Sequence, residues 1–142
     1  IGEKALFFFR VLFLYAAEIT DGLKSGALRT LTVVRGTAPE ALWELPAPTH
    51  VFIGGSSGNM RDIIKAALEK NPRARFVVNV IALESVGELA GLIKDMGFDE
   101  GEIVQLTIAR SRRLGKYNLM NGLNPIWIGT LQKGEEEEAN ED

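Results

Sequence analysis

The chain has 142 residues, enough for one compact domain with a core of its own, and no shift in composition indicates a second domain. It contains no cysteine, which excludes disulfide frameworks, thiolate zinc sites and cysteine nucleophiles. Its one histidine leaves little for a histidine-rich metal site, so we expect no metal. The formal net charge of -3 argues against a general nucleic-acid binder.

The first apolar run is ALFFFRVLFLYAA, from Ala5 to Ala17. Lys4 precedes it and small residues close it, as in a secretory signal. However, Arg10 interrupts the run, which is also shorter than the roughly 20 residues that span a bilayer. We favour a buried strand or core helix over a targeting or membrane segment, and expect a cytoplasmic protein without a membrane partner.

Strands and helices then alternate along the chain. The β-branched run Leu31 to Gly36 predicts a strand. Pro39 suits the first turn of a short helix, and THVFIGG, from Thr49, predicts the next strand. A helix follows, with Ser57 or Asn59 available as its cap. Its apolar positions at helical spacing are Met60, Ile63, Ile64, Ala67 and Leu68.

The next strand and helix are expected between residues 74 and 97. Ala74 to Ala82 is a nearly continuous apolar run, typical of a strand that is covered on both faces. The helix is expected to begin with Ser85 and Glu88 in capping-box spacing and to end at Gly97. Its expected inner stripe is Val86, Leu89, Ala90 and Ile93.

Two final strands, Glu102 to Arg110 and Asn124 to Leu131, have only a polar, basic connection between them. The whole pattern predicts an α/β fold with a mainly parallel sheet, helices on both of its faces and a final antiparallel strand pair. We expect residues 1–132 to form this domain. The acidic stretch 133–142 is expected to be a disordered tail.

The turn Gly54-Gly55-Ser56-Ser57-Gly58 has the spacing of a hydrolase nucleophile elbow, and it lies between a strand and a helix as that motif requires. The elbow also needs a histidine base. His50 begins the strand, and six extended residues of about 3.3 Å each place it roughly 20 Å from Ser56. We therefore interpret the match as accidental. The chain also lacks a G-x-G-x-x-G motif and a phosphate-loop lysine motif.

Ligands of open α/β sheets bind where the strands run into helices. Three loops have suitable chemistry: GTAPE, GGSSGN and NVIALES. Glycine permits close backbone approach, and free amides at a helix start favour an anionic or polar ligand. The basic connection carries Arg110, Arg112, Arg113 and Lys116, which suit carboxylates or phosphates. We expect it to lie at the edge of the same cleft as the glycine-serine turn.

Three stretches in unbroken order resemble a known family: Val33 to Ile64, Asn79 to Ser85, and Ala109 to Ile128. The combination of FIGGSSGN with a downstream SRxLGxYxLMxxxNP resembles the methyltransferase domain of the decarboxylating precorrin-6Y C5,15-methyltransferases of cobalamin biosynthesis. The resemblance implies a Rossmann-like class I methyltransferase fold that uses S-adenosyl-L-methionine. It also implies methylation of C15 of a precorrin and decarboxylation of its ring C acetate.

The resemblance implies site residues too, although no catalytic one. Thr37 and Ala38 would lie beside the adenine, and Gly54 and Gly55 would complete the cofactor contacts. The residues implied for the tetrapyrrole are Ser56, Gly58, Asn79, Arg110, Arg112, Lys116, Tyr117 and Asn124. For the polar side chains, a structural cap or turn bond is the alternative, and this holds also for Glu84 beside the same strand end.

The chain departs from the family pattern at its start. Family members open with a strand and a G-x-G-x-G loop around the methionine part of the cofactor, and their next strand ends in an acidic residue for the ribose. This chain has no such loop. Glu18 resembles the acidic residue, but too few residues separate it from Thr32 for the usual helix. The front of the cofactor site is therefore shortened, absent or supplied by sequence outside this chain, which would truncate the fold at its N-terminus.

Two further functions compete with the enzyme. The first is a catalytically incomplete binding or dimerisation module derived from the same fold. The second, an RNA or protein methyltransferase, needs a basic groove with aromatic stacking residues, which the sequence does not show. We expect a tetrapyrrole partner, a homo-oligomer, and a fused or separate C5-methyltransferase domain.

Overall fold

The protein is described by a computed structural model over residues 5–8, 34, 36–55 and 58–134. The expected tail lies beyond Gly134, outside the described residues, so the tail and the boundary at residue 132 stay predictions. Most of the strand expected from Leu31 to Gly36 also lies outside them, and of that stretch Val34 and Gly36 are described outside any strand.

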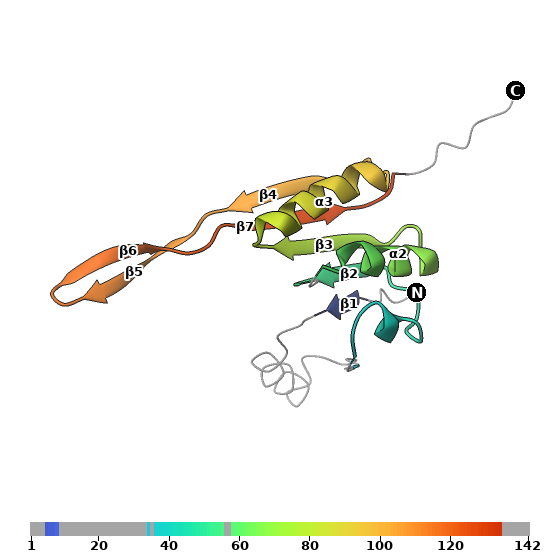
Figure 1. The fold of residues 1–142 in the computed structure, drawn as a ribbon, viewed down its shortest axis with the longest axis horizontal. Coiled ribbons are helices and arrows are strands. Elements are labelled where there is room, and N and C mark those ends of the chain that lie inside the picture. The colour runs from blue at the N-terminus through green and yellow to red at the C-terminus, as the bar shows by residue number, and fades with distance from the viewer. Residues whose placement is uncertain (1–4, 9–33, 35, 56–57, 135–142) are drawn as a thin grey trace, which may run out of the picture.

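A five-stranded sheet forms the body of the protein, in the order β1-β2-β3-β7-β4 (Figure 1). Its strands are β1 (Ala5–Phe8), β2 (His50–Ile53), β3 (Arg75–Val80), β4 (Glu102–Leu106) and β7 (Ile126–Leu131). The first three are parallel, and β7 is antiparallel to both β3 and β4. The expected mainly parallel sheet with a final antiparallel pair is confirmed.

Two helices cover one face of this sheet: α2 (Met60–Lys70) connects β2 to β3, and α3 (Leu83–Asp95) connects β3 to β4. Both connections step the same way across the sheet between parallel strands, and right-handed crossovers then place both helices on the same face. In the described part of the chain, the expected helices on both faces are therefore not found. No described helix has the length and apolar character needed to cross a membrane.

Helix α2 has the inner face that the spacing predicts. Its buried residues are Met60, Ile63, Ile64, Ala67 and Leu68. Against them lie alternate residues of β3, Phe76, Val78 and Val80, while Val77 and Asn79 on the opposite face are only partly buried. The capping prediction is half confirmed. Asn59 is the N-cap residue, but its side chain makes no capping bond.

Helix α3 begins at Leu83, before the predicted capping box of Ser85 and Glu88, so that prediction is wrong. The N-cap residue is Ala82, and Glu88 Oε1 instead accepts a hydrogen bond from the Arg61 backbone at 3.4 Å. Leu89 and Leu92 are the buried positions, whereas the predicted Ala90 is exposed. The expected end of this helix at Gly97 is confirmed.

The end of α3 has the geometry of a Schellman motif. Gly97 has a φ of 65°, and the Phe98 backbone N–H donates to the Ile93 carbonyl at 3.1 Å. Phe98 then packs edge-on against Phe76, with 6.0 Å between the ring centroids. The left-handed glycine thus returns the chain to the core.

The helix expected at Pro39 is one turn of 3-10 helix, η1 (Glu40–Leu42), with Pro39 as its N-cap residue. Leu42 is buried in the core, and Lys70 of α2 donates from Nζ to the Trp43 carbonyl at 2.7 Å. The segment is too short to bury more than one large apolar side chain, so its position depends on α2.

The basic connection is a β-hairpin that the sequence analysis missed. It consists of β5 (Ala109–Leu114) and β6 (Tyr117–Gly122), with a two-residue turn in which Gly115 has a φ of 61°. We call it the arm. Every residue of both strands is exposed, and the arm projects from the body beyond β4 and β7 (Figure 1).

Gly129 allows β7 to pass close to α3. A Cβ atom at Gly129 would lie 2.8 Å from Cδ2 and 3.0 Å from Cδ1 of Leu89, which is fully buried. The 2.8 Å distance is shorter than a Cβ atom tolerates, so a side chain at residue 129 would have to displace Leu89.

We expect Gly129→Val to lower the free energy of unfolding by about 1–3 kcal/mol, because overpacking outweighs the strand propensity of valine. Gly87→Ala is the matched control. A Cβ atom there meets nothing within 4 Å, and alanine should stabilise α3 by about 0.5–1 kcal/mol. Urea unfolding measures both. A Gly129→Val protein as stable as the parent would contradict the close approach.

Candidate functional site

The carboxyl ends of β2, β3 and β4 lie at one edge of the sheet, because these strands run in the same direction. We call this the carboxyl edge and define it by Gly54, Gly55, Gly58, Asn79 and Ile81–Glu84. Ligands of open α/β sheets bind at such an edge.

The register of β2 and β3 places the glycine turn beside Asn79. Ile53 pairs with Val78, so Gly54 follows opposite Asn79. On its other side Asn79 pairs with Ile128 of β7. The expected site residues Gly54 and Asn79 are therefore neighbours, although 25 positions separate them in the sequence.

A hydrogen bond joins the Thr37–Ala38 loop to the glycine turn. The side-chain amide of Asn59, directly after the turn, donates from Nδ2 to the Ala38 carbonyl at 3.3 Å. The loop is held by its own turn, in which Ala41 N–H donates to the Thr37 carbonyl at 2.9 Å. Of the expected cofactor residues, the four that are described, Thr37, Ala38, Gly54 and Gly55, thus lie on two loops that Asn59, expected only as a helix cap, connects.

The glycines of the turn differ in what requires them. Gly58 has a φ of 88°, a conformation that favours glycine over other residues. Gly55 has no positive φ, and a Cβ atom there would meet nothing within 4 Å. Packing of the described residues therefore gives no reason for glycine at position 55. Gly54 and Gly55 are both exposed, so their backbone is open to close approach by a ligand.

Asn79 carries an unsatisfied polar atom at the centre of the carboxyl edge. Its Oδ1 is buried and has no hydrogen-bond partner among the described residues. A buried acceptor without a donor costs about 1–3 kcal/mol, so such atoms in native proteins need an explanation. A ligand that donates a hydrogen bond to Asn79 would provide one.

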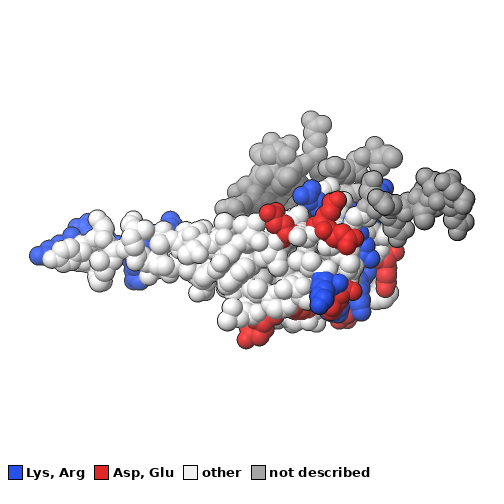
Figure 2. Space-filling model, turned by 90° about the horizontal axis from the view of Figure 1, so that it is seen from above, with Lys and Arg blue, Asp and Glu red and all other residues white. Residues whose placement is uncertain are grey.

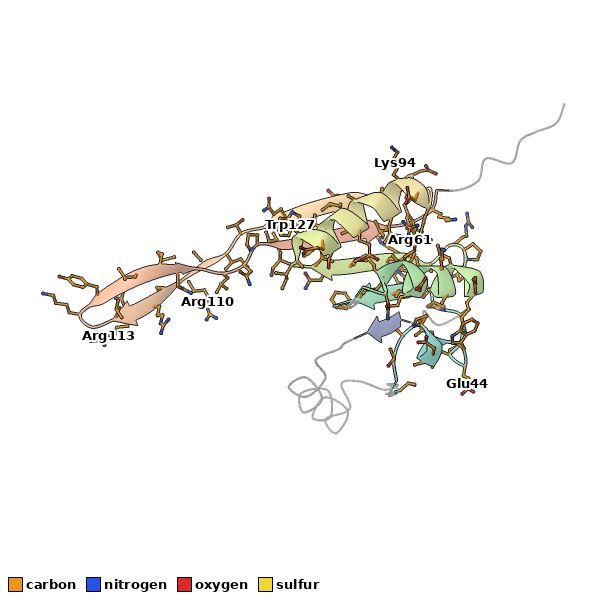
Figure 3. The ribbon with its side chains drawn as sticks, in the orientation of Figure 1. Glu44, Arg61, Lys94, Arg110, Arg113 and Trp127 are labelled. Atoms are coloured by element: carbon orange, nitrogen blue, oxygen red, sulfur yellow. The ribbon has the colours of Figure 1, made fainter. Side chains whose placement is uncertain are left out.

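The remaining expected site residues lie on or beside the arm. Asn124 is exposed just before β7, at the base of the arm. Arg110 and Arg112 lie on β5, and Lys116 in the turn places its Nζ over the Tyr117 ring, 5.2 Å from the centroid. Figure 3 shows Arg110 and Arg113 pointing into solvent along the arm.

The arm and the glycine turn do not form the expected shared cleft within one chain. The arm leaves the sheet at Leu106 and returns at Ile126, which are both at the carboxyl edge. It then extends away from the body, because its two strands pair only with each other in the described structure (Figure 1). The arm and the glycine turn therefore both begin at the carboxyl edge, but the arm carries its basic residues away from the turn.

Two expected residues, Glu18 and Ser56, lie outside the described residues, and their roles stay predictions. His50 begins β2, at the sheet edge opposite the glycine turn, and its Nδ1 is 3.2 Å from Thr49 Oγ1. This placement supports the interpretation of the elbow spacing as accidental. In the part of the chain that the structure describes, no cluster of acidic or histidine side chains could hold a metal ion.

Comparisons with known proteins give a consistent result. Residues 15–133 match the family model described as "Precorrin methyltransferase domain". The probable cobalt-precorrin-6B C(15)-methyltransferase (decarboxylating) of Pyrobaculum calidifontis is 38% identical over 107 residues, which cover 75% of this chain and 54% of that protein. The counterpart from Methanothermobacter thermautotrophicus is 36% identical over 97 residues, 68% of this chain and 50% of that protein. The chain thus spans about half the length of these curated relatives.

Solved structures show the same similarity. The precorrin-6Y C5,15-methyltransferase of Geobacter metallireducens is 30% identical, with a TM-score of 0.71 over 93% of this chain and 69% of that one. The fold extends to an S-adenosylmethionine-dependent O-methyltransferase of Thermotoga maritima, at 15% identity and a TM-score of 0.59 over 96% of this chain and 52% of that one. The expected Rossmann-like class I methyltransferase fold is confirmed.

The described carboxyl edge has chemistry that fits part of S-adenosylmethionine. The backbone at Gly54 and Gly55 is open to approach, and Thr37 is exposed beside it. The Asn79 acceptor suits a hydroxyl or ammonium group of a ligand.

Replacing Asn79 separates a ligand-binding role from a structural one. We expect Asn79→Leu to leave the free energy of unfolding unchanged or to raise it by about 1 kcal/mol, because no hydrogen bond to Oδ1 is lost. The control is Asn71→Leu. Asn71 donates to the Pro48 carbonyl at 2.7 Å and accepts from the Arg73 backbone at 3.0 Å. The Asn71→Leu substitution should lower the free energy of unfolding, measured with urea, by about 1–3 kcal/mol. A comparable loss for Asn79→Leu would show that Asn79 is structural.

Proposed function

This chain belongs to the precorrin methyltransferase domain family, and on that premise we propose that it takes part in S-adenosylmethionine-dependent methylation of C15, with decarboxylation, of a precorrin intermediate in cobalamin biosynthesis. The observation that carries the proposal is the grouping of Thr37–Ala38, Gly54–Gly55 and the unsatisfied Asn79 Oδ1 at one sheet edge. The relatives named for this activity are longer than the chain, so the activity is proposed for the chain within such a protein.

The role of these residues in the proposed reaction is to position the reactants. The cofactor supplies an electrophilic methyl group on sulfur, and alignment of that group with a substrate carbon lowers the barrier without acid-base chemistry. The backbone at Gly54 and Gly55 can approach a ligand closely because no side chain intervenes. The Thr37–Ala38 loop, held by Asn59, would orient the adenosine part of the cofactor. Asn79 would lie between the cofactor and the tetrapyrrole and accept a hydrogen bond from a bound ligand. We assign no catalytic residue.

The substrate side of the proposal depends on charge. Precorrins carry many carboxylates, and Arg110, Arg112 and Lys116 of the arm are cations suited to them. Tyr117 offers an aromatic face beside Lys116. The proposed partners are accordingly a precorrin, a second copy of this chain, and a C5-methyltransferase domain, fused or separate, in the cytoplasm.

A second candidate function is a non-catalytic binding module of the same fold. The sequence favours it in one respect, because the chain contains no G-x-G-x-G loop for the methionine part of the cofactor. Such a module would bind the tetrapyrrole without S-adenosylmethionine. The two candidate functions therefore differ in whether the chain binds S-adenosylmethionine.

Calorimetric titration with S-adenosylmethionine distinguishes them. We expect binding in the micromolar range or tighter, and we expect Gly55→Val to weaken it at least tenfold, about 1.4 kcal/mol, because its side chain would fill the approach to the backbone. The substitution should leave the fold unchanged, since a Cβ atom at residue 55 meets nothing within 4 Å.

The control for this titration is Gly87→Ala, on an exposed part of α3, which should bind like the parent. No heat from the parent protein at micromolar concentration would favour the non-catalytic module. If Gly55→Val and the parent bind S-adenosylmethionine equally well, the turn is not part of the cofactor site.

A further inference from the structure

The Thr37–Ala38 loop belongs to a stretch, residues 36–48, whose longest regular element is the single turn η1. We call this stretch the loop segment. Leu42 and Pro48 are its buried residues, and the large side chain of Trp43 is 65% exposed. A segment with so few buried apolar side chains opens locally at low cost unless other bonds hold it. The position of the loop therefore depends on polar contacts with the body of the protein.

The start of the loop segment is one compact turn. The Ala41 backbone N–H donates to the Thr37 carbonyl at 2.9 Å. A Cβ atom at Gly36 would lie 2.7 Å from Cβ of Ala41, so the chain on both sides of the loop is in close contact. Because Ala41 belongs to η1, the Thr37–Ala38 loop and η1 form one unit. Whatever holds η1 in place also holds the loop.

Lys70, the last residue of α2, holds the carboxyl end of η1. Its Nζ donates to the Trp43 carbonyl at 2.7 Å and also to the Leu45 carbonyl. The Leu45 N–H in turn donates to the Leu42 carbonyl at 3.1 Å, which joins this part of the chain to η1. Hydrogen bonds from an ammonium group are stronger than those between neutral groups. Lys70 therefore fixes η1 to the end of α2.

The bonds of Lys70 differ in kind from the ion pairs of the body. Figure 2 shows basic and acidic side chains close to one another on the body, and Arg61 of α2 pairs with Asp95 of α3 at 2.8 Å. Such a pair joins two partly solvated side chains and contributes little to stability. The acceptors of Lys70 are backbone carbonyls, whose positions define the path of the chain. Loss of these bonds would therefore change where the loop segment lies.

Helix α2 contacts the loop segment at both of its own ends. At the amino end, Asn59 donates to the Ala38 carbonyl at 3.3 Å, and at the carboxyl end Lys70 holds η1. Eleven residues with a rise of about 1.5 Å each separate these ends by about 16 Å. The glycine turn directly precedes this helix. The two contacts with α2 therefore set the position of the Thr37–Ala38 loop relative to the turn.

We propose that Lys70 is a positioning residue for the cofactor, which acts through η1 to hold the Thr37–Ala38 loop where the adenosine part binds. Lys70 lies at the end of α2 remote from the glycine turn, so it acts without touching the cofactor. Its role in binding rests on the proposed function. Its hold on the loop rests only on the bonds to the Trp43 and Leu45 carbonyls.

The hold on the loop is tested without any ligand, by amide hydrogen exchange in the full chain. Lys70→Met keeps an unbranched apolar side chain but removes the ammonium group. The Ala41 and Leu45 amides, which donate within the loop segment, should then exchange about tenfold faster, because one support of the segment is lost. The Ile63 amide of α2 should keep the rate of the parent. Unchanged exchange at Ala41 and Leu45 would overturn the proposal.

The effect on binding is tested by calorimetric titration with S-adenosylmethionine and with adenosine. We expect Lys70→Met to weaken both by the same factor, about fivefold, because the displaced loop contacts the part that the two ligands share. A loss for S-adenosylmethionine without a loss for adenosine would place the effect elsewhere in the site and overturn the proposal.

Two further variants separate positioning from stability. Asn71→Leu, at the next residue, loses a bond to the Pro48 carbonyl and is expected to be less stable. Pro48 lies just before β2, whose place the sheet fixes, so this variant should bind like the parent. Lys70→Arg retains a cation with several donors and should recover most of the lost affinity. Equal weakening by Asn71→Leu and Lys70→Met, or no recovery in Lys70→Arg, would show that Lys70 has no positioning role.

The two experiments separate the hold on the loop from the proposed function. If the parent does not bind S-adenosylmethionine, the proposed methylation and the role of Lys70 in binding both fail, while hydrogen exchange still decides whether Lys70 holds the loop. If the parent binds and Lys70→Met binds equally well despite faster exchange at Ala41, Lys70 holds the loop but does not position the cofactor. That result would overturn the positioning role and leave the proposed function intact.

Discussion

The parallel pairing of β2 with β3 is the constraint on which the rest of the structure depends. This pairing places Ile53 beside Val78, and therefore Gly54 beside Asn79. The strands are short, and their register is specified because alternate residues of β3 are buried against α2. A slip of one residue would turn Asn79 toward the helices and Val78 away from them, so the core itself fixes the candidate site.

The position of β7 has a consequence at the same edge. Because β7 lies antiparallel between β3 and β4, the chain must leave the sheet after Leu106 and return at Ile126 from the carboxyl edge. Any segment between them therefore extends from the side where ligands of this fold class bind. In this chain that segment is a regular hairpin that carries four cations. Gly129 allows β7 to occupy this central place beneath Leu89.

The proposed site would combine two kinds of recognition that lie apart in one chain. At the body, exposed glycine backbone and the Asn79 amide suit a cofactor with hydroxyl and amine groups. On the arm, arginines and an aromatic ring suit a large polyanion. Methyl transfer to carbon depends on alignment of two bound molecules, so a division of binding between a rigid edge and an extended arm is compatible with such chemistry.

The sequence by itself determined the family and most of the local elements. The spacing of Met60, Ile63 and Ala67 fixed the inner face of α2, because helical periodicity is local. The predicted start of α3 was wrong because the helix begins at Leu83 after Ala82, an N-cap residue whose side chain makes no capping bond, so no local capping signal marks the start. The hairpin had one local signal, the glycine of Leu-Gly-Lys-Tyr, but mixed polar and apolar residues hid its strands. The unsatisfied Asn79 oxygen, the helices on one face and the direction of the arm were decided only by tertiary structure, because each depends on the register between segments far apart in the chain.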